Sequence, residues 1–463
     1  VKAFNENMPF DQFTVWQLAG DLLPEASEEQ KIATGFNRNH MINGEGGRIA
    51  EENRVEYIFD QLETVGTVWM GLTFNCCRCH DHKFDPLTNK DYYSFFAFFN
   101  QTEVTGEGGD PKMPPNLPLY TDEAKKRLSE LQDEIAAATP GVDARKRELG
   151  PGQADWERAQ HFRIALAEDT ESELAKLLDV PADQRDEKQN EKVKGLFLES
   201  DETYREANEQ LRDLTKERDG IDKKAVKVMV MQDMAELRPT YVLERGVYSK
   251  HKEEVAAATP AALPVMPLDA PRNRLGLARW LVDPQHPLTS RVTVNRFWAE
   301  FFGQGLVRTT ENFGVQGGPA SHPELLDWLA LTFTETGWDV KALLRLFVTS
   351  AAYRQSSEAG IEALAADPQN RYLSRGPRFR MPSWMIRDQA LFAGGLLAPK
   401  LGGPSVKPYQ PDGLWEEFSF GNIKYERDTG ESLYRRSLYT FWRRIVAPPL
   451  FFDSSTRQTC TVK

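Results

Sequence analysis

One short segment, Cys76-Cys77-Arg78-Cys79-His80, combines residue types and a spacing that can hold a cofactor. Its Cys-x-x-Cys-His pattern is the one used for covalent attachment of a c-type haem. Two thiols three residues apart on one helical turn can each add to a haem vinyl group, and the histidine that follows can bind the iron as an axial ligand. The segment therefore predicts haem c attached to Cys76 and Cys79, with His80 as the proximal ligand.

The distribution of cysteines supports a cofactor or metal site at this segment. The chain has four cysteines, and three of them fall within four positions, whereas a disulfide framework would spread them out. The fourth, Cys460, is either a buried thiol or half of a bridge whose partner could be Cys77. The roles of Cys77 and Cys460 stay open at this point.

Two alternatives to haem use the same residues. Zinc or iron could be held by a set of four side chains, Cys76, Cys79, His80 and His82. These four lie within seven positions, which is tight for tetrahedral closure, and the second cysteine pair that usually completes a zinc site is missing. The other alternative is a redox-active or structural thiol cluster.

A haem iron also takes a second axial ligand or keeps an open face. The candidates for that ligand are His40, Met41 and His82. His82 is only two residues beyond His80, so the same turn would have to wrap around the haem. His40 and Met41 lie on an expected loop that could fold back, and for His40 a hydrogen-bonded structural role is an equal alternative.

Charged residues near the motif are candidates for a supporting shell. Asp81 or Asp85 could accept a hydrogen bond from the far nitrogen of a ligating histidine and tune its basicity, although Asp85-Pro86 is also typical of a plain turn. Arg48 could neutralise a haem propionate. Aromatic residues are the candidate walls of a haem slot, with ordinary core as their alternative role: Trp69, Phe95, Phe96, Phe98 and Phe99.

Length and composition limit the classes of function. The 463 residues are 40% hydrophobic, which is enough for more than one core. The net charge of −12 argues against nucleic acid as a partner. No run approaches the roughly 20 apolar residues that span a bilayer, so we expect no transmembrane segment. Since the chain starts at Val1 and not at Met, we expect a fragment cut at both ends, in which a signal peptide would not be seen.

The periodicity of apolar residues predicts a mainly α chain with a small β element near 226–247 and a projecting antiparallel helical hairpin. Residues 51–74 and a very aromatic stretch that starts after Thr88 are expected helices. Gly and Pro around 140–152 are expected to break the first helix of the hairpin. The expected regions are 1–120 with the Cys-x-x-Cys-His motif, 121–225 as a helical coiled-coil arm, 226–268 as a β-rich connector and 269–463 as a helical region.

The run from Gly71 to Pro86, GLTFNCCRCHDHKFDP, resembles the signature of large planctomycete-type proteins that carry a cytochrome-c-like module, a DUF1549 region and a DUF1553 region. Upstream, Pro9-Phe10-Asp11-Gln12-Phe13 fits the same DUF1549 region. Downstream, Val294-Asn295-Arg296 and Phe313-Gly314-Val315-Gln316-Gly317 resemble DUF1553. The resemblance covers nearly the whole chain except the arm. One departure is Cys77, where relatives tend to carry a small residue.

This resemblance implies an exported, periplasmic or otherwise extracytoplasmic protein that works with a redox partner protein or a cytochrome module. Our first hypothesis is therefore a c-type haem protein for electron transfer or a coupled oxidation. Such a protein could be a component of an oxidoreductase. The second is a non-haem metalloenzyme that uses the Cys/His cluster, and the third is a scaffold that binds partners through the arm. Motifs of serine hydrolases, zinc proteases and phosphate-binding loops are absent from the sequence.

Overall fold

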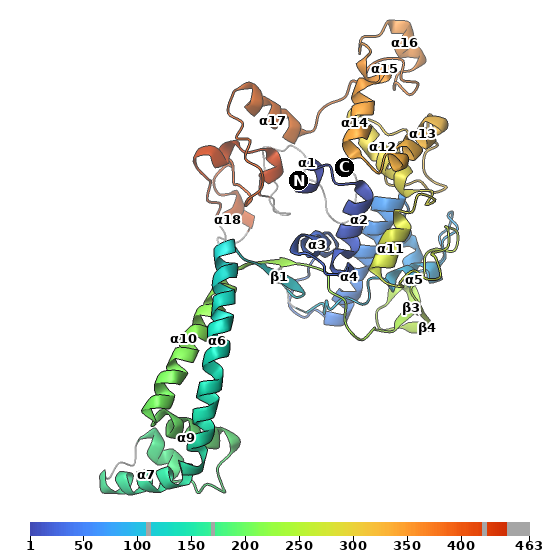
Figure 1. Cartoon of the computed structure of the whole chain (residues 1–463). Helices are drawn as coiled ribbons and strands as arrows, with labels where there is room; N and C mark the ends of the chain where they lie inside the picture. The colour runs from blue at the N-terminus through green and yellow to red at the C-terminus, as the bar shows by residue number, and fades with distance from the viewer. Residues whose placement is uncertain (108–112, 168–171, 419–423, 442–463) are drawn as a thin grey trace. The chain divides into compact units, whose positions relative to one another are not determined.

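The computed structural model of the chain describes residues 1–107, 113–167, 172–418 and 424–441. It divides into two compact units: Leu117–Val228 forms one, and the segments before and after it form the other. Helices dominate both units (Figure 1), and the strands of the described residues are short. The mainly α fold with small β elements that the sequence predicts is confirmed. Among the helices of these residues, none is long and apolar enough to cross a membrane.

The first part of the larger unit is a set of helices joined by tight turns. Its α-helices are α1 (Lys2–Asn5), α2 (Phe10–Ala19), α3 (Glu28–Ala33), α4 (Ala50–Val65) and α5 (Asn89–Phe96). A π-helical turn, η3 (Gly66–Met70), extends α4, and a 3₁₀ turn, η4 (Phe74–Arg78), follows it. The helix expected over 51–74 is therefore shorter than predicted, because Gly71 takes a left-handed conformation with φ 60° and ends it.

The smaller unit is built around two long helices that lie side by side (Figure 1). It contains α6 (Asp122–Leu149), α7 (Gln153–Ala167), α8 (Glu173–Leu178), α9 (Glu187–Glu199) and α10 (Glu202–Lys224). Strands β1 (Asn116–Leu119) and β2 (Val226–Met229) pair where the chain enters and leaves the unit.

The sequence predicts a break around residues 140–152, and α6 ends within that range. The helix continues through Pro140 to Leu149 and ends only at the 3₁₀ turn Gly150–Gly152. A proline inside a helix costs about 3 kcal/mol. Packing offsets this cost, because Val142, two residues after the proline, is buried against Phe197, Leu198 and Tyr204.

The rest of the larger unit starts with a hairpin and continues as helices. The hairpin pairs β3 (Thr240–Leu243) with β4 (His251–Val255) in antiparallel register, with Thr240 opposite Val255. The helices are α11 (Arg274–Leu281), α12 (Thr289–Phe302), α13 (Pro323–Glu335), α14 (Val340–Thr349), α15 (Ala351–Arg354), α16 (Ile361–Ala366), α17 (Ser383–Ala393) and α18 (Leu414–Phe418).

Two large hydrophobic cores and a small one around Tyr57, Val104 and Met113 lie among the described residues of this unit. The first joins α2, α4, α5, α11 and the hairpin, and the second joins α12, α13 and α14. In α4 the apolar residues repeat every three or four positions and are all buried, as expected for one face of an amphipathic helix: Val55, Ile58, Phe59, Leu62 and Val65. Phe10 packs against both cores and so joins them.

A buried ion triad holds the two halves of the larger unit together. The guanidinium of Arg274, fully buried, donates to both carboxylate oxygens of Asp21 at 2.8 and 2.6 Å and to Asp233 at 2.9 Å. Burial raises the pKa of Asp233, and the arginine charge opposes that rise. Because charges in an apolar interior are stable only when paired, this triad fixes α11 to the chain after α2.

Candidate functional site

The Cys-x-x-Cys-His motif lies on η4 and the residues directly after it. At the start of the motif segment the ring of Phe74 packs closely against the backbone of Gly66. A Cβ on Gly66 would lie 2.6 Å from that ring. The far side of the segment leads into α5, which begins with a reciprocal capping box between Thr88 and Asp91. Both ends of the motif segment are therefore held by local structure that requires these residue types.

The three clustered thiols have different surroundings. Cys76 and Cys79 are exposed, while Cys77 is fully buried in the first core. The cause is the 3₁₀ turn, in which side chains three positions apart lie one above the other. Cys76 and Cys79 thus lie toward one side, and Cys77 is turned inward. Burial raises the pKa of Cys77 to about 12, and its Sγ lies 3.6 Å from the carbonyl oxygen of Leu87.

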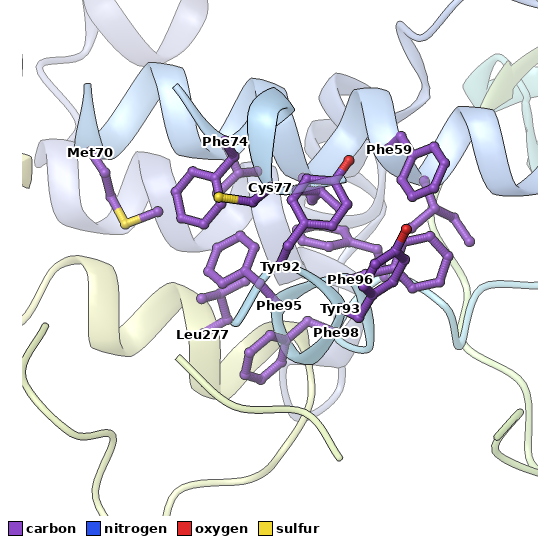
Figure 2. Packing of buried hydrophobic residues seen from close by; sticks show 14 of the residues in the cluster. Phe59, Met70, Phe74, Cys77, Tyr92, Tyr93, Phe95, Phe96, Phe98 and Leu277 are labelled. Carbon is purple, nitrogen blue, oxygen red and sulfur yellow. The ribbon is translucent and has the colours of Figure 1, made fainter. Parts of the chain in front are cut away.

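The core beneath the motif is rich in aromatic rings (Figure 2). Cys77 and Met70 lie among the rings of α4, η4 and α5, and the ring of Phe74 stacks on that of Phe95 at 5.5 Å. Five residues that were candidate walls of a haem slot are 3% exposed or less and belong to this core: Trp69, Phe95, Phe96, Phe98 and Phe99. They serve as core, the alternative role that the sequence left open.

Arg78, in the middle of the motif, anchors it to α4. Its guanidinium forms a two-point ion pair with Glu56, one bond being 2.9 Å, and lies 4.1 Å above the ring of Phe59. Its carbonyl oxygen accepts a hydrogen bond of 2.8 Å from the hydroxyl of Tyr93 on α5. The turn that carries the two exposed thiols is therefore held from both neighbouring helices.

The imidazole of His80 is exposed and presents one free nitrogen. Its Nδ1 lies 2.7 Å from the carbonyl oxygen of Asp81. A carbonyl can only accept, so Nδ1 carries the hydrogen and the neutral ring keeps its lone pair on Nε2. Histidines that bind metals commonly have this arrangement, in which a hydrogen bond at one nitrogen sets the other as the ligand.

His82, unlike His80, has a buried side chain that is hydrogen-bonded to the backbone. Its side chain is 5% exposed, and its Nδ1 accepts hydrogen bonds from the backbone N–H groups of Phe84 and Asp85 at 3.3 and 2.8 Å. The carboxylate of Asp85 is also buried and lies 3.4 Å from this nitrogen. Its other oxygen accepts a hydrogen bond of 2.6 Å from the N–H of Val315. His82 and Asp85 thus stabilise the 82–87 turn and its contact with a distant loop.

The remaining predicted residues lie in other surroundings. His40 is buried and stacked on Tyr57 at 4.3 Å, its Nδ1 lies 3.0 Å from the carbonyl oxygen of Met41, and its Nε2 has no hydrogen-bond partner among the described residues. Burial lowers the pKa of His40 to about 4. The side chain of Met41 is half exposed. Arg48 donates to the carbonyl oxygen of Glu45 at the surface.

Asp81 caps α5, since its carboxylate accepts a hydrogen bond of 2.7 Å from the N–H of Asn89. Within the part of the chain that the structure describes, no three or more His, Cys, Asp or Glu side chains are grouped so that they could hold a metal ion. Cys460 lies outside the described residues.

The sequence did not indicate that the β3–β4 hairpin contributes to this site. The Sγ of Cys79 lies 3.4 Å from the carbonyl oxygen of Arg245, in the turn of that hairpin. A Cβ on the next residue, Gly246, would lie 2.6 Å from Nε of Arg78. A glycine is required there by this close approach and by its φ of 73°. The contact joins residues 166 positions apart, which no local pattern signals.

Comparison with protein-family models identifies both halves of the larger unit. Residues 1–104 match PSCyt2, described as a protein of unknown function (DUF1549), and residues 273–463 match PSD1, a protein of unknown function (DUF1553). No curated protein and no solved structure matches the chain. The chain therefore combines a DUF1549 region with a DUF1553 region.

Proposed function

We propose that this chain is an extracytoplasmic c-type haem protein that transfers electrons, alone or in a coupled oxidation. Cys76 and Cys79 would form the two thioether bonds and His80 would bind the iron. The observation that carries the proposal is the different exposure of the clustered residues: the two thiols with the right spacing and the imidazole are exposed, and the third thiol is not.

The donor set fits the chemistry of attachment. Thioether formation requires two thiols that reach one edge of the porphyrin, and Cys76 and Cys79, three positions apart at the end of a 3₁₀ turn, are both exposed. Iron binding requires an imidazole nitrogen with a lone pair, and the bond from Nδ1 to the Asp81 carbonyl makes Nε2 the nitrogen that would bind the iron. Cys77 does not compete, because it is buried and its pKa is raised to about 12.

The anchoring of the motif also supports this role. Arg78 is bound to Glu56 and covers the ring of Phe59, so the protein's own residues hold the turn. A haem bound here would supply one-electron transfer, and its iron would be tuned by the axial ligand and by solvent exposure. Because the aromatic side chains below are buried core, the group would lie on the outer side of the turn.

The two family matches support the setting of the proposal. Proteins with these regions are associated with planctomycete cytochromes, which suggests an extracytoplasmic place and a redox partner protein or cytochrome module. The zinc or iron alternative would need His82 as a fourth ligand, and its ring already holds a backbone turn. No feature of the described residues favours the scaffold role over the haem role.

The test is the absorption spectrum of the full chain, exported by a host that carries the cytochrome c maturation machinery. We expect a pyridine haemochrome spectrum of c-type haem at one haem per chain. The Cys76→Ser/Cys79→Ser variant should lose all covalent haem, and the matched Cys77→Ala variant should keep it. Wild-type protein that is folded and free of covalent haem, or that holds stoichiometric zinc or iron without porphyrin, would overturn the proposal.

A further inference from the structure

A cavity of about 280 Å³ opens in the DUF1553 region, away from the cysteine motif in sequence. Three loops surround it, 303–308, 318–321 and 369–379, together with the end of α12. Its apolar side is aromatic: the rings of Trp298 and Phe302 are parallel at 3.8 Å, and Phe379 adds a third ring. The volume is just below the roughly 300–1,000 Å³ of pockets for drug-sized ligands, so the cavity suits a smaller organic molecule.

The charged residues that line the cavity are all cationic. They are Arg308, Arg371 and Arg378, and no Asp or Glu is among the lining residues that the structure describes. This is unusual in a chain with a net charge of −12. Arg308 donates to the side-chain oxygen of Gln369. For the guanidinium groups of Arg371 and Arg378, the described residues provide no ion pair, so both are available to an anion.

The walls are held in place by hydrogen bonds that do not involve any ligand. The buried amide of Asn295 binds the backbone of Val307 twice, donating to its carbonyl oxygen at 2.9 Å and accepting from its N–H at 2.8 Å. On the opposite wall the carboxylate of Asp367 accepts from the N–H groups of Arg371 and Tyr372 at 2.8 and 2.9 Å. The carboxylate of Asp367 therefore stabilises the loop that carries Arg371.

The ring of Phe379 can lie close to the end of α12 only because a glycine is there. Gly303 has a φ of 77°, and a Cβ there would lie 2.7 Å from the ring of Phe379. The absence of a side chain lets that ring close over the end of α12. A pocket with preformed walls needs less ordering when a ligand binds, and this favours affinity.

We propose that this cavity is a binding site for a small organic anion. Its oxyanion group, a carboxylate, sulfate ester or phosphate ester, would be held by Arg371 and Arg378, since guanidinium groups match the planar and tetrahedral oxyanions with paired N–H donors. The apolar or ring-shaped body of the ligand would lie against Phe302 and Phe379. The site is independent of the proposed haem function.

The test is calorimetric titration of the full chain at low salt with phenyl phosphate, phenyl sulfate and benzoate, and with benzylamine as a cation of similar size. We expect saturable binding of at least one anion and none of the amine, and the strongest of the three anions identifies the oxyanion class. Because the site is electrostatic, higher salt should weaken the binding. Binding of benzylamine as tight as that of the anions, or no saturable binding of any anion, would overturn the proposal.

Variants locate the binding. The double variant Arg371→Gln/Arg378→Gln should bind the tightest of the three anions with an affinity lower by roughly tenfold or more. This is the size expected for loss of charge-assisted hydrogen bonds. The matched control is Arg212→Gln, an exposed arginine of the smaller unit, which should bind as wild type. All three arginines are exposed, so folding should be unaffected, and circular dichroism checks it. Equal affinity of the double variant and the control would place the anion elsewhere and contradict the site.

Discussion

The carboxylate of Asp85 accepts a hydrogen bond from the backbone N–H of Val315 at 2.6 Å, across 230 positions of sequence. Asp85 belongs to the DUF1549 region and Val315 to the DUF1553 region. A Cβ on the neighbouring Gly314 would lie 2.4 Å from the same carboxylate. The two family regions therefore meet in a contact that requires both a short acid on one side and a glycine on the other.

Removing either side of this contact should destabilise the larger unit. Asp85→Ala removes a charge-assisted hydrogen bond, which costs about 1.5–3 kcal/mol, and Gly314→Ala overpacks the contact by a similar amount. The double variant should lose less than the sum of the two, since both act on one contact. Urea unfolding measures all three.

The control for this cycle is Gly318→Ala, because a Cβ there meets only the hydroxyl of Thr309 at 3.9 Å. It should unfold at the wild-type urea concentration. Strict additivity of the Asp85 and Gly314 variants would show that the two residues act separately.

The buried ion triad should be far more sensitive than an exposed ion pair. Arg274→Ala leaves the carboxylates of Asp21 and Asp233 in the interior without a partner, and we expect a loss of about 3–5 kcal/mol in the free energy of unfolding. The comparison is Arg291→Ala, which breaks an exposed pair with Asp327 and should lose less than about 1 kcal/mol. Similar losses in both variants, measured by urea unfolding, would contradict the account of the triad.

The clustered thiols should differ in reactivity. In protein produced without haem and carrying Cys460→Ser, two thiols should react with a thiol reagent in the folded state. These are Cys76 and Cys79, because they are exposed. Cys77 should react only after unfolding, since it is buried and its raised pKa of about 12 leaves almost no thiolate. Peptide mapping of the labelled sites is the measurement, and early labelling of Cys77 would show that the turn is not as described.

Two buried histidines should make the fold sensitive to acid. Burial lowers the pKa of His40 and of His286 from 6.5 to about 4. The unfolded chain therefore takes up a proton at each site first, so stability is full above pH 6.5 and falls as the pH drops toward 4. Between pH 7 and pH 5 each site should contribute a loss of about 2 kcal/mol.

The variant His40→Phe keeps the ring stacked on Tyr57 and removes the titration. Urea unfolding at pH 7 and at pH 5 should show that this variant loses about 2 kcal/mol less than wild type between the two values. If the variant and the wild type lose the same free energy of unfolding between pH 7 and pH 5, His40 takes up its proton equally in the folded and unfolded states.

Local patterns predicted much of the fold. The three-and-four spacing of Val55, Ile58 and Leu62 is a property of one helix face, and the Thr88–Asp91 capping box is complete within four residues. The length of the helix after Val65 was predicted less well. Its π-helical turn and the left-handed Gly71 depend on packing against Phe313 and Val292, which lie far along the chain.

The same limit applies to the site. The motif spacing predicted which residues are chemically capable, and this stays a prediction; in the structure Cys76, Cys79 and His80 are exposed. The contact of Cys79 with Arg245 and the structural use of His82 were not predictable. Both depend on where backbone groups of distant or irregular segments lie, and side-chain spacing carries no information on them.

The most direct test of the central claim is mass spectrometry of the proteolytic peptide that contains residues 76–80, from protein matured with haem and then denatured. Our account predicts that this peptide retains the mass of one haem, bonded to Cys76 and Cys79, with Cys77 as a free thiol. A peptide without haem, or one bonded through Cys77, would contradict it.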